Sequence, residues 1–127
     1  MADTELTAPS IPKRDDDRLW AAFAHLGGVV SILPALLIFL AYKDSARFAT
    51  GQAKEALNFQ MTLVGTYLAT IVGGLLLGAV SLDPVDWVHV ALGVALAIVS
   101  VVFSIMGFTS ASRGVAYRYP VCLRLIR

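Results

Sequence analysis

The sequence has little charge and only one cysteine. Asp, Glu, Lys and Arg make up 15% of its 127 residues, whereas soluble globular domains carry about 25%. A single cysteine excludes an internal disulfide and a thiolate metal cluster, and a net charge of +1 excludes the basic excess of nonspecific nucleic-acid binding. Hydrophobic residues make up 57% of the chain, too many for so short a chain to bury in a water-soluble domain. The composition therefore indicates a membrane protein with no nucleic-acid partner.

The apolar residues gather in three runs that contain no Asp, Glu, Lys or Arg, at 19–42, 56–82 and 87–112. About 20 apolar residues, rising about 1.5 Å each, cross a hydrocarbon core of about 30 Å. Backbone groups in lipid need partners within their own segment, which favours helices. We therefore predict an all-α integral membrane protein with two full transmembrane helices, at 54–82 and 87–112.

The first run, residues 19–42, is interrupted by Gly27, Gly28 and Pro34. Proline removes a helical hydrogen bond and clashes with the preceding turn, so we expect a break near Pro34. The run is then either a kinked span or a re-entrant hairpin. It is too long for the apolar core of a signal peptide and ends in no cleavage site, which disfavours cleavage.

The basic residues favour the re-entrant hairpin. Lys and Arg near membrane spans collect on the cytoplasmic side, and the connection 83–86 contains none. Three full spans would divide the ten basic residues between the two sides, whereas a re-entrant first run places all ten on one side. We therefore expect a multi-pass protein of the bacterial inner membrane with a cytoplasmic C-terminus and with 83–86 as the outer turn. Residues 1–18 are expected to form a polar flexible tail, and residues 19–127 a single membrane domain.

The second run carries small and polar residues four apart, in register along the helix. They are Asn58, Thr62, Thr66, Thr70, Gly74 and Gly78, with Glu55 one turn before Asn58. Small residues let membrane helices approach closely, so this stripe predicts packing against a protein partner or a second copy. The alternative is a proton or cation route that begins at Glu55, because acidic groups near membrane depth often mark pathways.

The third run carries small residues at heptad-like spacing, from Gly93 to Gly114, which predicts a close helix crossing. The segment that follows it, residues 113–127, mixes arginine with apolar residues and is expected to lie at the cytoplasmic membrane interface. The candidate interfacial residues are Lys54, Arg113, Tyr117, Arg118, Tyr119 and Arg124.

The sequence offers little for catalysis or metal binding. His25 and His89 lie within apolar runs with no second ligand at metal-binding spacing, so each is expected to bond a neighbouring helix. There is no glycine-rich phosphate loop, nucleophile–base pair or hydrolytic carboxylate pair. We expect no enzyme activity, no cofactor and no metal.

Three motifs carry a family resemblance: RLWAAFAHLGG at 18–28, AKEALNFQ at 53–60, and RGVAYRYP at 113–120 followed by RLI at 124–126. With them the chain resembles the membrane component of the chloroplast inner-envelope protein-import (Tic-type) translocon and, more closely, its small bacterial relatives. The resemblance implies an all-helical protein related to four-span proteins with both termini on one side. Residues 50–52 depart from the family, which has an Arg and a His before the second motif.

Two functions follow as hypotheses. The first is a non-enzymatic module or scaffold subunit of a membrane assembly, with a link to protein translocation that comes from the resemblance alone. The second is a channel or carrier for an ion or small solute, with Glu55, Asn58 and the threonines along its route. One such subunit is too small to enclose a pore, so the second hypothesis requires oligomers.

Overall fold

The computed structural model describes residues 14–76, 78 and 87–127, and within that part the chain is helical without strands. The helices are α1 (Arg14–Val30), α2 (Leu33–Tyr42), α3 (Arg47–Leu76) and α4 (Trp87–Ser112). By length and composition α3 and α4 can cross a membrane. This confirms the all-helical class and the two long apolar helices.

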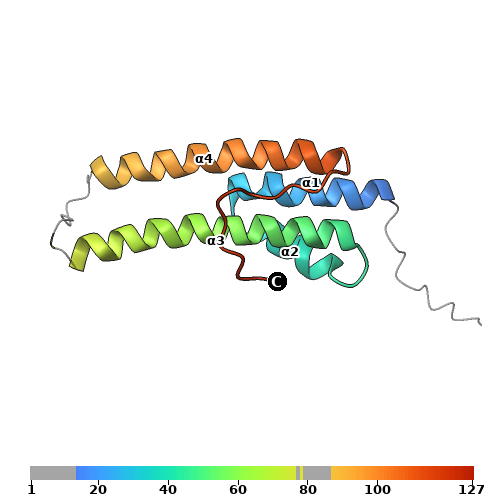
Figure 1. The fold of residues 1–127 in the computed structure, drawn as a ribbon, viewed down its shortest axis with the longest axis horizontal. Helices are drawn as coiled ribbons and strands as arrows, with labels where there is room; N and C mark the ends of the chain where they lie inside the picture. The colour runs from blue at the N-terminus through green and yellow to red at the C-terminus, as the bar shows by residue number, and fades with distance from the viewer. Residues whose placement is uncertain (1–13, 77, 79–86) are drawn as a thin grey trace, which may run out of the picture.

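The first apolar run forms two separate helices, and a single kinked helix is not what the structure shows. Helix α1 ends at Val30, and the chain then reverses direction so that α2 runs back beside it (Figure 1). The break therefore precedes Pro34, which lies in the first turn of α2. Proline is tolerated there because the first N–H groups of a helix have no partner within it. The side chain of Ser31 accepts the N–H of Leu33 across the break at 3.0 Å.

The bounds of the other segments also differ from expectation. Helix α3 begins at Arg47, before the expected start at Lys54, and its described part ends at Leu76. Residues 77 and 79–82 of the expected span, and the expected outer turn 83–86, lie outside the described residues. The expected tail 1–18 contributes residues 14–18 to α1, and its remainder also lies outside them.

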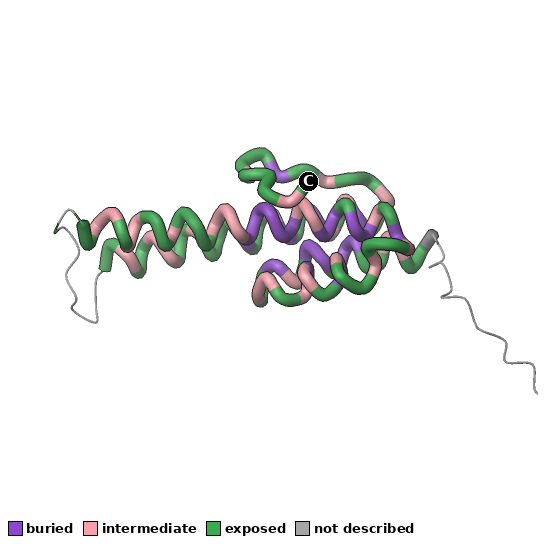
Figure 2. The backbone as a smooth tube through the Cα atoms, turned by 90° about the horizontal axis from the view of Figure 1, so that it is seen from below, coloured by how far each residue is buried: buried purple, intermediate pink, exposed green. Residues whose placement is uncertain are grey.

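The four helices overlap along only part of their length. Helices α1 and α2 lie beside the half of α3 and α4 that is drawn on the right in Figure 1, while α3 and α4 continue past them as a pair. The buried residues follow this arrangement (Figure 2). Those of α3 lie between Ala49 and Gln60, and those of α4 between Ser100 and Ala111.

Alanines make up most of the core. Six of them are fully buried where α1 meets α3 and α4: Ala21, Ala22, Ala24, Ala49, Ala53 and Ala111. Small side chains let helices approach closely, which gives the dense packing that membrane helices use in place of a hydrophobic drive. Asp17 links the start of α1 to the start of α3, because its Oδ1 accepts the N–H of Ala49 at 2.6 Å.

Candidate functional site

Residues 113–127 form an extended segment, here called the strap, that leaves α4 and runs back over the bundle before crossing α3 (Figure 1). The turn into the strap depends on Gly114, which has φ +76°. This positive φ is a conformation that glycine adopts without strain. A Cβ at position 114 would also lie 2.6 Å from Nε of Arg18, although the flexible arginine side chain can move away.

A buried polar network joins the strap to α1 and α3 through His25. Nε2 of His25 lies 2.9 Å from Oε1 of Gln52, and Nδ1 lies 2.7 Å from the hydroxyl of Tyr119. Since an amide oxygen only accepts, we assign the proton to Nε2, and Nδ1 accepts from the tyrosine. The same oxygen of Gln52 also accepts the N–H of Tyr117 at 2.9 Å. With this assignment the ring of His25 is neutral, because only one of its two nitrogens carries a proton.

Tyr119 is the aromatic anchor of the strap. It is 2% exposed and stacks on Phe59 of α3, with ring centroids 4.0 Å apart and planes within 9°. Phe103 of α4 meets the two rings edge-on. Burial also raises the pKa of Tyr119, so the hydroxyl keeps its proton and donates to His25.

Asn58 binds the end of the strap with both ends of its side-chain amide. Its Oδ1 accepts the N–H groups of Leu125 at 3.0 Å and Ile126 at 2.8 Å, and its Nδ2 donates to the carbonyl of Ile126 at 2.9 Å. One turn along α3, Oγ1 of Thr62 accepts the N–H of Leu123 at 2.9 Å. The side chains of Asn58 and Thr62 therefore bond backbone groups of the strap that would pair with another strand in a sheet.

Charged groups flank this contact. Oε1 of Glu55 lies 3.2 Å from Nε of Arg124 and 3.9 Å from Nε of Arg118. Its Oε2 is buried without a hydrogen-bond partner among the described residues. Lys54 donates to the carbonyl of Arg127 at 2.9 Å. Within the described part of the chain, no three His, Cys, Asp or Glu side chains are arranged to hold a metal ion.

The remaining members of the α3 stripe lie away from the strap. Thr66 and Thr70 donate to carbonyls of their own helix, at 2.8 and 2.7 Å. Gly74 is partly exposed, and Gly78 lies exposed beyond the helix end with φ +64°. Arg113 is exposed at the start of the strap. Near the strap the structure therefore brings together the start of the α3 stripe and most of the candidate interfacial residues: Glu55, Asn58, Thr62, Lys54, Tyr117, Arg118, Tyr119 and Arg124. Arg113 and the later members of the stripe lie elsewhere.

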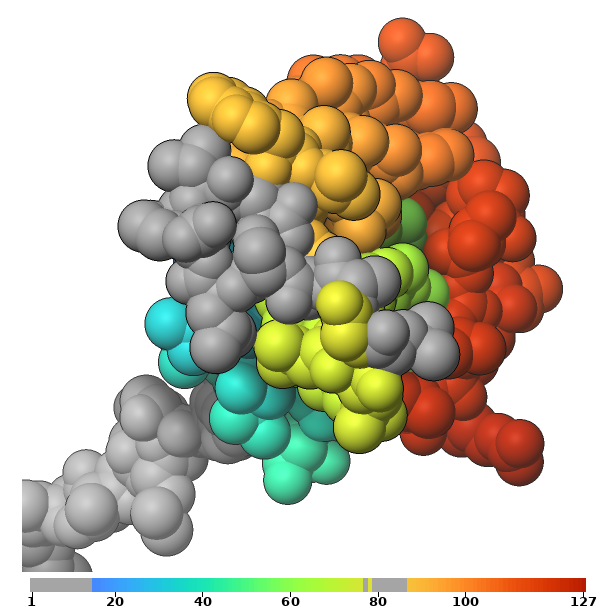
Figure 3. All heavy atoms as spheres, turned by 90° about the vertical axis from the view of Figure 1, so that its left-hand side faces the viewer, coloured from blue at the N-terminus to red at the C-terminus, as the bar shows by residue number. Residues whose placement is uncertain are grey.

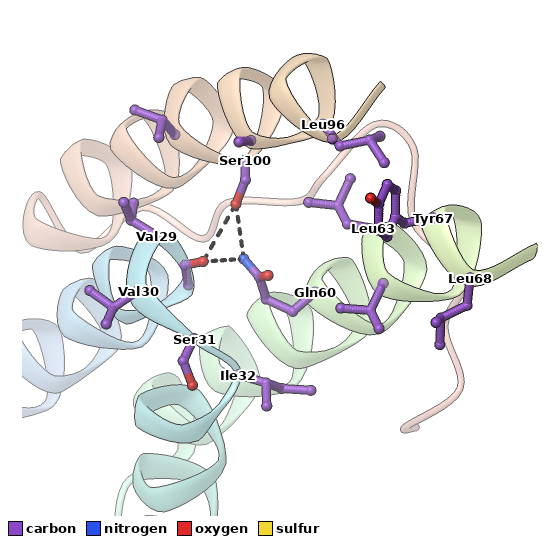
Figure 4. Close-up of a pocket in the computed structure, with 15 residues that line it drawn as sticks. Val29, Val30, Ser31, Ile32, Gln60, Leu63, Tyr67, Leu68, Leu96 and Ser100 are labelled. Carbon is purple, nitrogen blue, oxygen red and sulfur yellow. Dashed lines mark hydrogen bonds between the residues drawn. The ribbon is translucent and has the colours of Figure 1, made fainter. Parts of the chain in front are cut away.

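Two glutamines that sequence reasoning did not single out belong to the site. Gln52 bridges His25 and the strap, as described above. Gln60 donates to the carbonyl of Gly28 at 2.6 Å and to Ser100 at 3.2 Å, which ties the end of α1 to α3 and α4 (Figure 4). A signal was available, because both are polar residues two turns apart in an alanine-rich helix.

An open groove of about 590 Å³ lies beyond Gln60, between the α1–α2 turn and the continuing α3 and α4. Figure 4 shows the bonded triangle of Gln60, Ser100 and the Gly28 carbonyl at one end of it. Its other lining residues are mostly aliphatic and include Ile32, Leu63 and Leu96.

A model of the family described as "Magnetosome magnetite crystal formation protein family" matches residues 16–126. No curated protein and no solved structure matches the chain. The expected relation to a Tic-type translocon component is therefore wrong, because the matching family is a different one. The three sequence motifs that suggested that relation have structural roles in this fold. His25 of the first motif and Asn58 of the second bind the strap, and Tyr119 of the third is the most deeply buried residue of the strap.

Proposed function

The chain belongs to the magnetosome magnetite crystal formation protein family, and we propose that it acts in crystal formation as a non-enzymatic module of the membrane. In this role it contributes helices and a membrane-side surface to an assembly, without moving a solute itself. The observation that carries the proposal is that the polar side chains of α3 in the expected route are already bonded within the chain.

The bonding of these side chains argues against the channel hypothesis. Both ends of the Asn58 amide are bonded to the strap, and Oε1 of Glu55 faces Arg124. Thr66 and Thr70 return their hydroxyls to their own helix. A route for ions needs a row of polar groups that are free to coordinate them, whereas among these four side chains only Glu55 keeps an oxygen, Oε2, without a hydrogen-bond partner within the described residues.

The proposed membrane placement follows from the ends of the helices. Helices α3 and α4 cross the bilayer, and α1 and α2 enter and leave on one side as a re-entrant hairpin. The described basic side chains support this, because Arg18 meets Gly114, Lys54 meets Arg127, and Lys43 and Arg47 lie in or beside the turn from α2 to α3. By the preference of basic residues for the cytoplasm, this end and the strap are cytoplasmic.

The faces available to a partner lie on α3 beyond the hairpin. A Cβ at Gly65 or Gly73 would meet nothing within 4 Å, so these positions are open to another helix at close range. By contrast, the small residues of α4 are used inside the chain, since Ser100, Ser104, Gly107 and Ala111 are buried. We propose that a second copy or another membrane protein packs on the α3 face.

The proposal is tested in a magnetosome-forming host that lacks the gene, with crystal size measured by electron microscopy. Loss of the chain should give smaller or misshapen crystals, and the wild-type gene should restore them. The variant Glu55→Gln should also restore them, because the module needs no titrating group there. Normal crystals in the deletion strain would refute the module role, and failure of Glu55→Gln in a folded protein would favour the channel.

The placement is tested separately with a cysteine in the turn between α2 and α3, introduced as Asp44→Cys at an exposed position, while the chain's single native cysteine is removed as Cys122→Ser. A membrane-impermeant maleimide should label the new cysteine from the cytoplasmic side in inverted vesicles and not in intact spheroplasts. Labelling from the outer face of spheroplasts would contradict the orientation.

A further inference from the structure

The molecule is wider at one end than at the other. At the end that carries the strap, four helices and the strap lie side by side, whereas beyond the α1–α2 turn only α3 and α4 continue (Figure 1). Seen from the narrow end, the tips of α3 and α4 stand in front, with the hairpin and the strap set back (Figure 3). The hydrogen bonds of Gln60 to Gly28 and Ser100 mark the level at which the change occurs.

This level falls within one half of a bilayer. Helix α3 rises about 33 Å from Lys54 to Leu76, which matches a hydrocarbon core of about 30 Å. Gln60 lies about 9 Å inside Lys54, and about 24 Å of α3 remains beyond it. Since one leaflet contributes about 15 Å of hydrocarbon, the hairpin ends before the bilayer centre.

The hairpin gives the same depth independently. Trp20 of α1 and Tyr42 of α2 pair at its base, with ring centroids 5.2 Å apart, and such rings favour the headgroup level. From Trp20 to the end of α1 at Val30 the rise is about 15 Å, which places the tip of the hairpin close to the bilayer centre. Trp87, 74% exposed at the start of α4, provides an aromatic ring at the opposite interface.

The outer face of the hairpin has the chemistry of a surface in contact with lipid. Its exposed side chains are large and apolar: Leu19, Trp20, Phe23, Leu26, Val30, Leu33, Leu37 and Leu40. The hollow between its two helices is lined without polar surface. This face is continuous with the exposed apolar sides of α3 and α4, which include Val64, Leu68, Val94 and Ile98. Acyl chains of one leaflet are therefore its occupant.

We propose that the chain is a membrane wedge that binds preferentially to curved bilayers, with its strap side on the convex leaflet. Each helix is about 10–12 Å across, so the hairpin adds on the order of 200 Å² of cross-section to one leaflet only. In a curved bilayer the convex leaflet has a larger area than the concave leaflet, and a molecule with the larger cross-section in the convex leaflet fits this difference. The proposal rests on the membrane placement given above and adds a partner, the curved lipid surface.

The test compares small sonicated vesicles with large extruded vesicles, both made of phosphatidylethanolamine and phosphatidylglycerol. The full chain is reconstituted into both kinds of vesicle from the same detergent mixture. Impermeant maleimide counts the molecules whose cysteine at position 44, in the Asp44→Cys and Cys122→Ser background, faces outward, and a second round after detergent counts the rest. Outward molecules have the wide end on the convex leaflet. We expect the outward-to-inward ratio to be at least about twofold higher in small vesicles than in large ones. The ratio reports the difference in free energy between the two orientations, and only strong curvature should favour the outward one.

Two matched variants connect the effect to the hairpin. Val30→Lys with Leu33→Lys charges the hairpin tip, where the side chains are 83% and 59% exposed. The lysines should draw the tip to the interface and abolish the shift in ratio. Leu19→Lys with Leu40→Lys adds the same charges at the base of the hairpin, near Trp20 and Tyr42, where the side chains are 50% and 54% exposed, and should preserve the shift.

The possible outcomes separate shape from placement. Equal ratios in small and large vesicles for the wild-type chain would overturn the wedge and leave the placement intact. The same holds if the variant at the hairpin base loses the shift along with the variant at the hairpin tip, since the effect would then follow charge alone. A chain that alkaline carbonate removes from both kinds of vesicle would overturn the placement and the wedge together.

Discussion

Replacing Asn58 with leucine should release the end of the strap and leave the helices in place. The amide makes three hydrogen bonds to the strap backbone, each contributing about 0.5–1.5 kcal/mol net. Their loss should lower the free energy of opening the strap by about 1.5–4.5 kcal/mol. The helix itself should persist, because leucine is a good helix former and position 58 is buried at 1% exposure.

Hydrogen exchange in lipid nanodiscs measures this opening directly. At about 1.4 kcal/mol for each factor of ten, the amides of Leu125 and Ile126 should exchange about ten to a thousand times faster than in the wild type. Amides within α4 should be unaffected, since local opening does not require global unfolding. Thr66→Val is the matched control, because Thr66 bonds only its own helix. Unchanged exchange at Leu125 and Ile126 in the leucine variant would refute the assignment of Asn58 as the residue that holds the strap.

Further predictions concern the packing of α1. The neutral ring of His25 accepts a hydrogen bond from the hydroxyl of Tyr119 at Nδ1, and protonation would remove that acceptor. A histidine in the unfolded chain takes up a proton below about pH 6.5, so thermal stability in detergent should fall as the pH drops below that value. His25→Phe should flatten this dependence, and an unchanged slope would contradict the assignment. At Gly107 a Cβ would lie 2.6 Å from the His25 ring, so Gly107→Ala should cost about 1–3 kcal/mol in unfolding experiments. At Gly51 a Cβ meets nothing within 4 Å, so Gly51→Ala should instead stabilise by about 0.5–1 kcal/mol; equal effects at the two positions would show that the α1–α4 contact is misplaced.

The sequence predicts the long helices better than the hairpin. Apolar length alone identifies α4, whose bounds are those of the third run. Pro34 is the strongest local signal for a break near it, and the break falls just before it, at Ser31 and Ile32, so that Pro34 lies in the first turn of the next helix. Proline marks the neighbourhood of a break, whereas the exact residue depends on which N–H groups find partners across the turn.

The strap contacts could not be predicted because they join residues far apart in the sequence. Asn58 and Leu125 are polar and apolar residues on separate segments, and helical periodicity describes only the face on which Asn58 lies. It gives no information on what meets that face. The stripe from Asn58 to Gly78 is regular in sequence, yet its two ends have different surroundings: Asn58 is 1% exposed under the strap, while Gly78 is exposed beyond the helix.

The location of the buried polar groups explains why the hairpin stops where it does. Lipid offers no hydrophobic drive that would hold α1 against α3 and α4, so close packing and hydrogen bonds must do so. The deepest of these bonds joins Gln60 to the carbonyl of Gly28. Gly28 is among the last four residues of α1, whose carbonyls have no donor within the helix. Beyond this point the facing residues are apolar, including Leu63 and Leu96. A longer α1 would pack only on apolar surfaces of α3 and α4, which lipid chains cover equally well, so the extra length would add little stability. The hydrogen bonds of Gln60 therefore set both the depth of the hairpin and the level at which the molecule narrows.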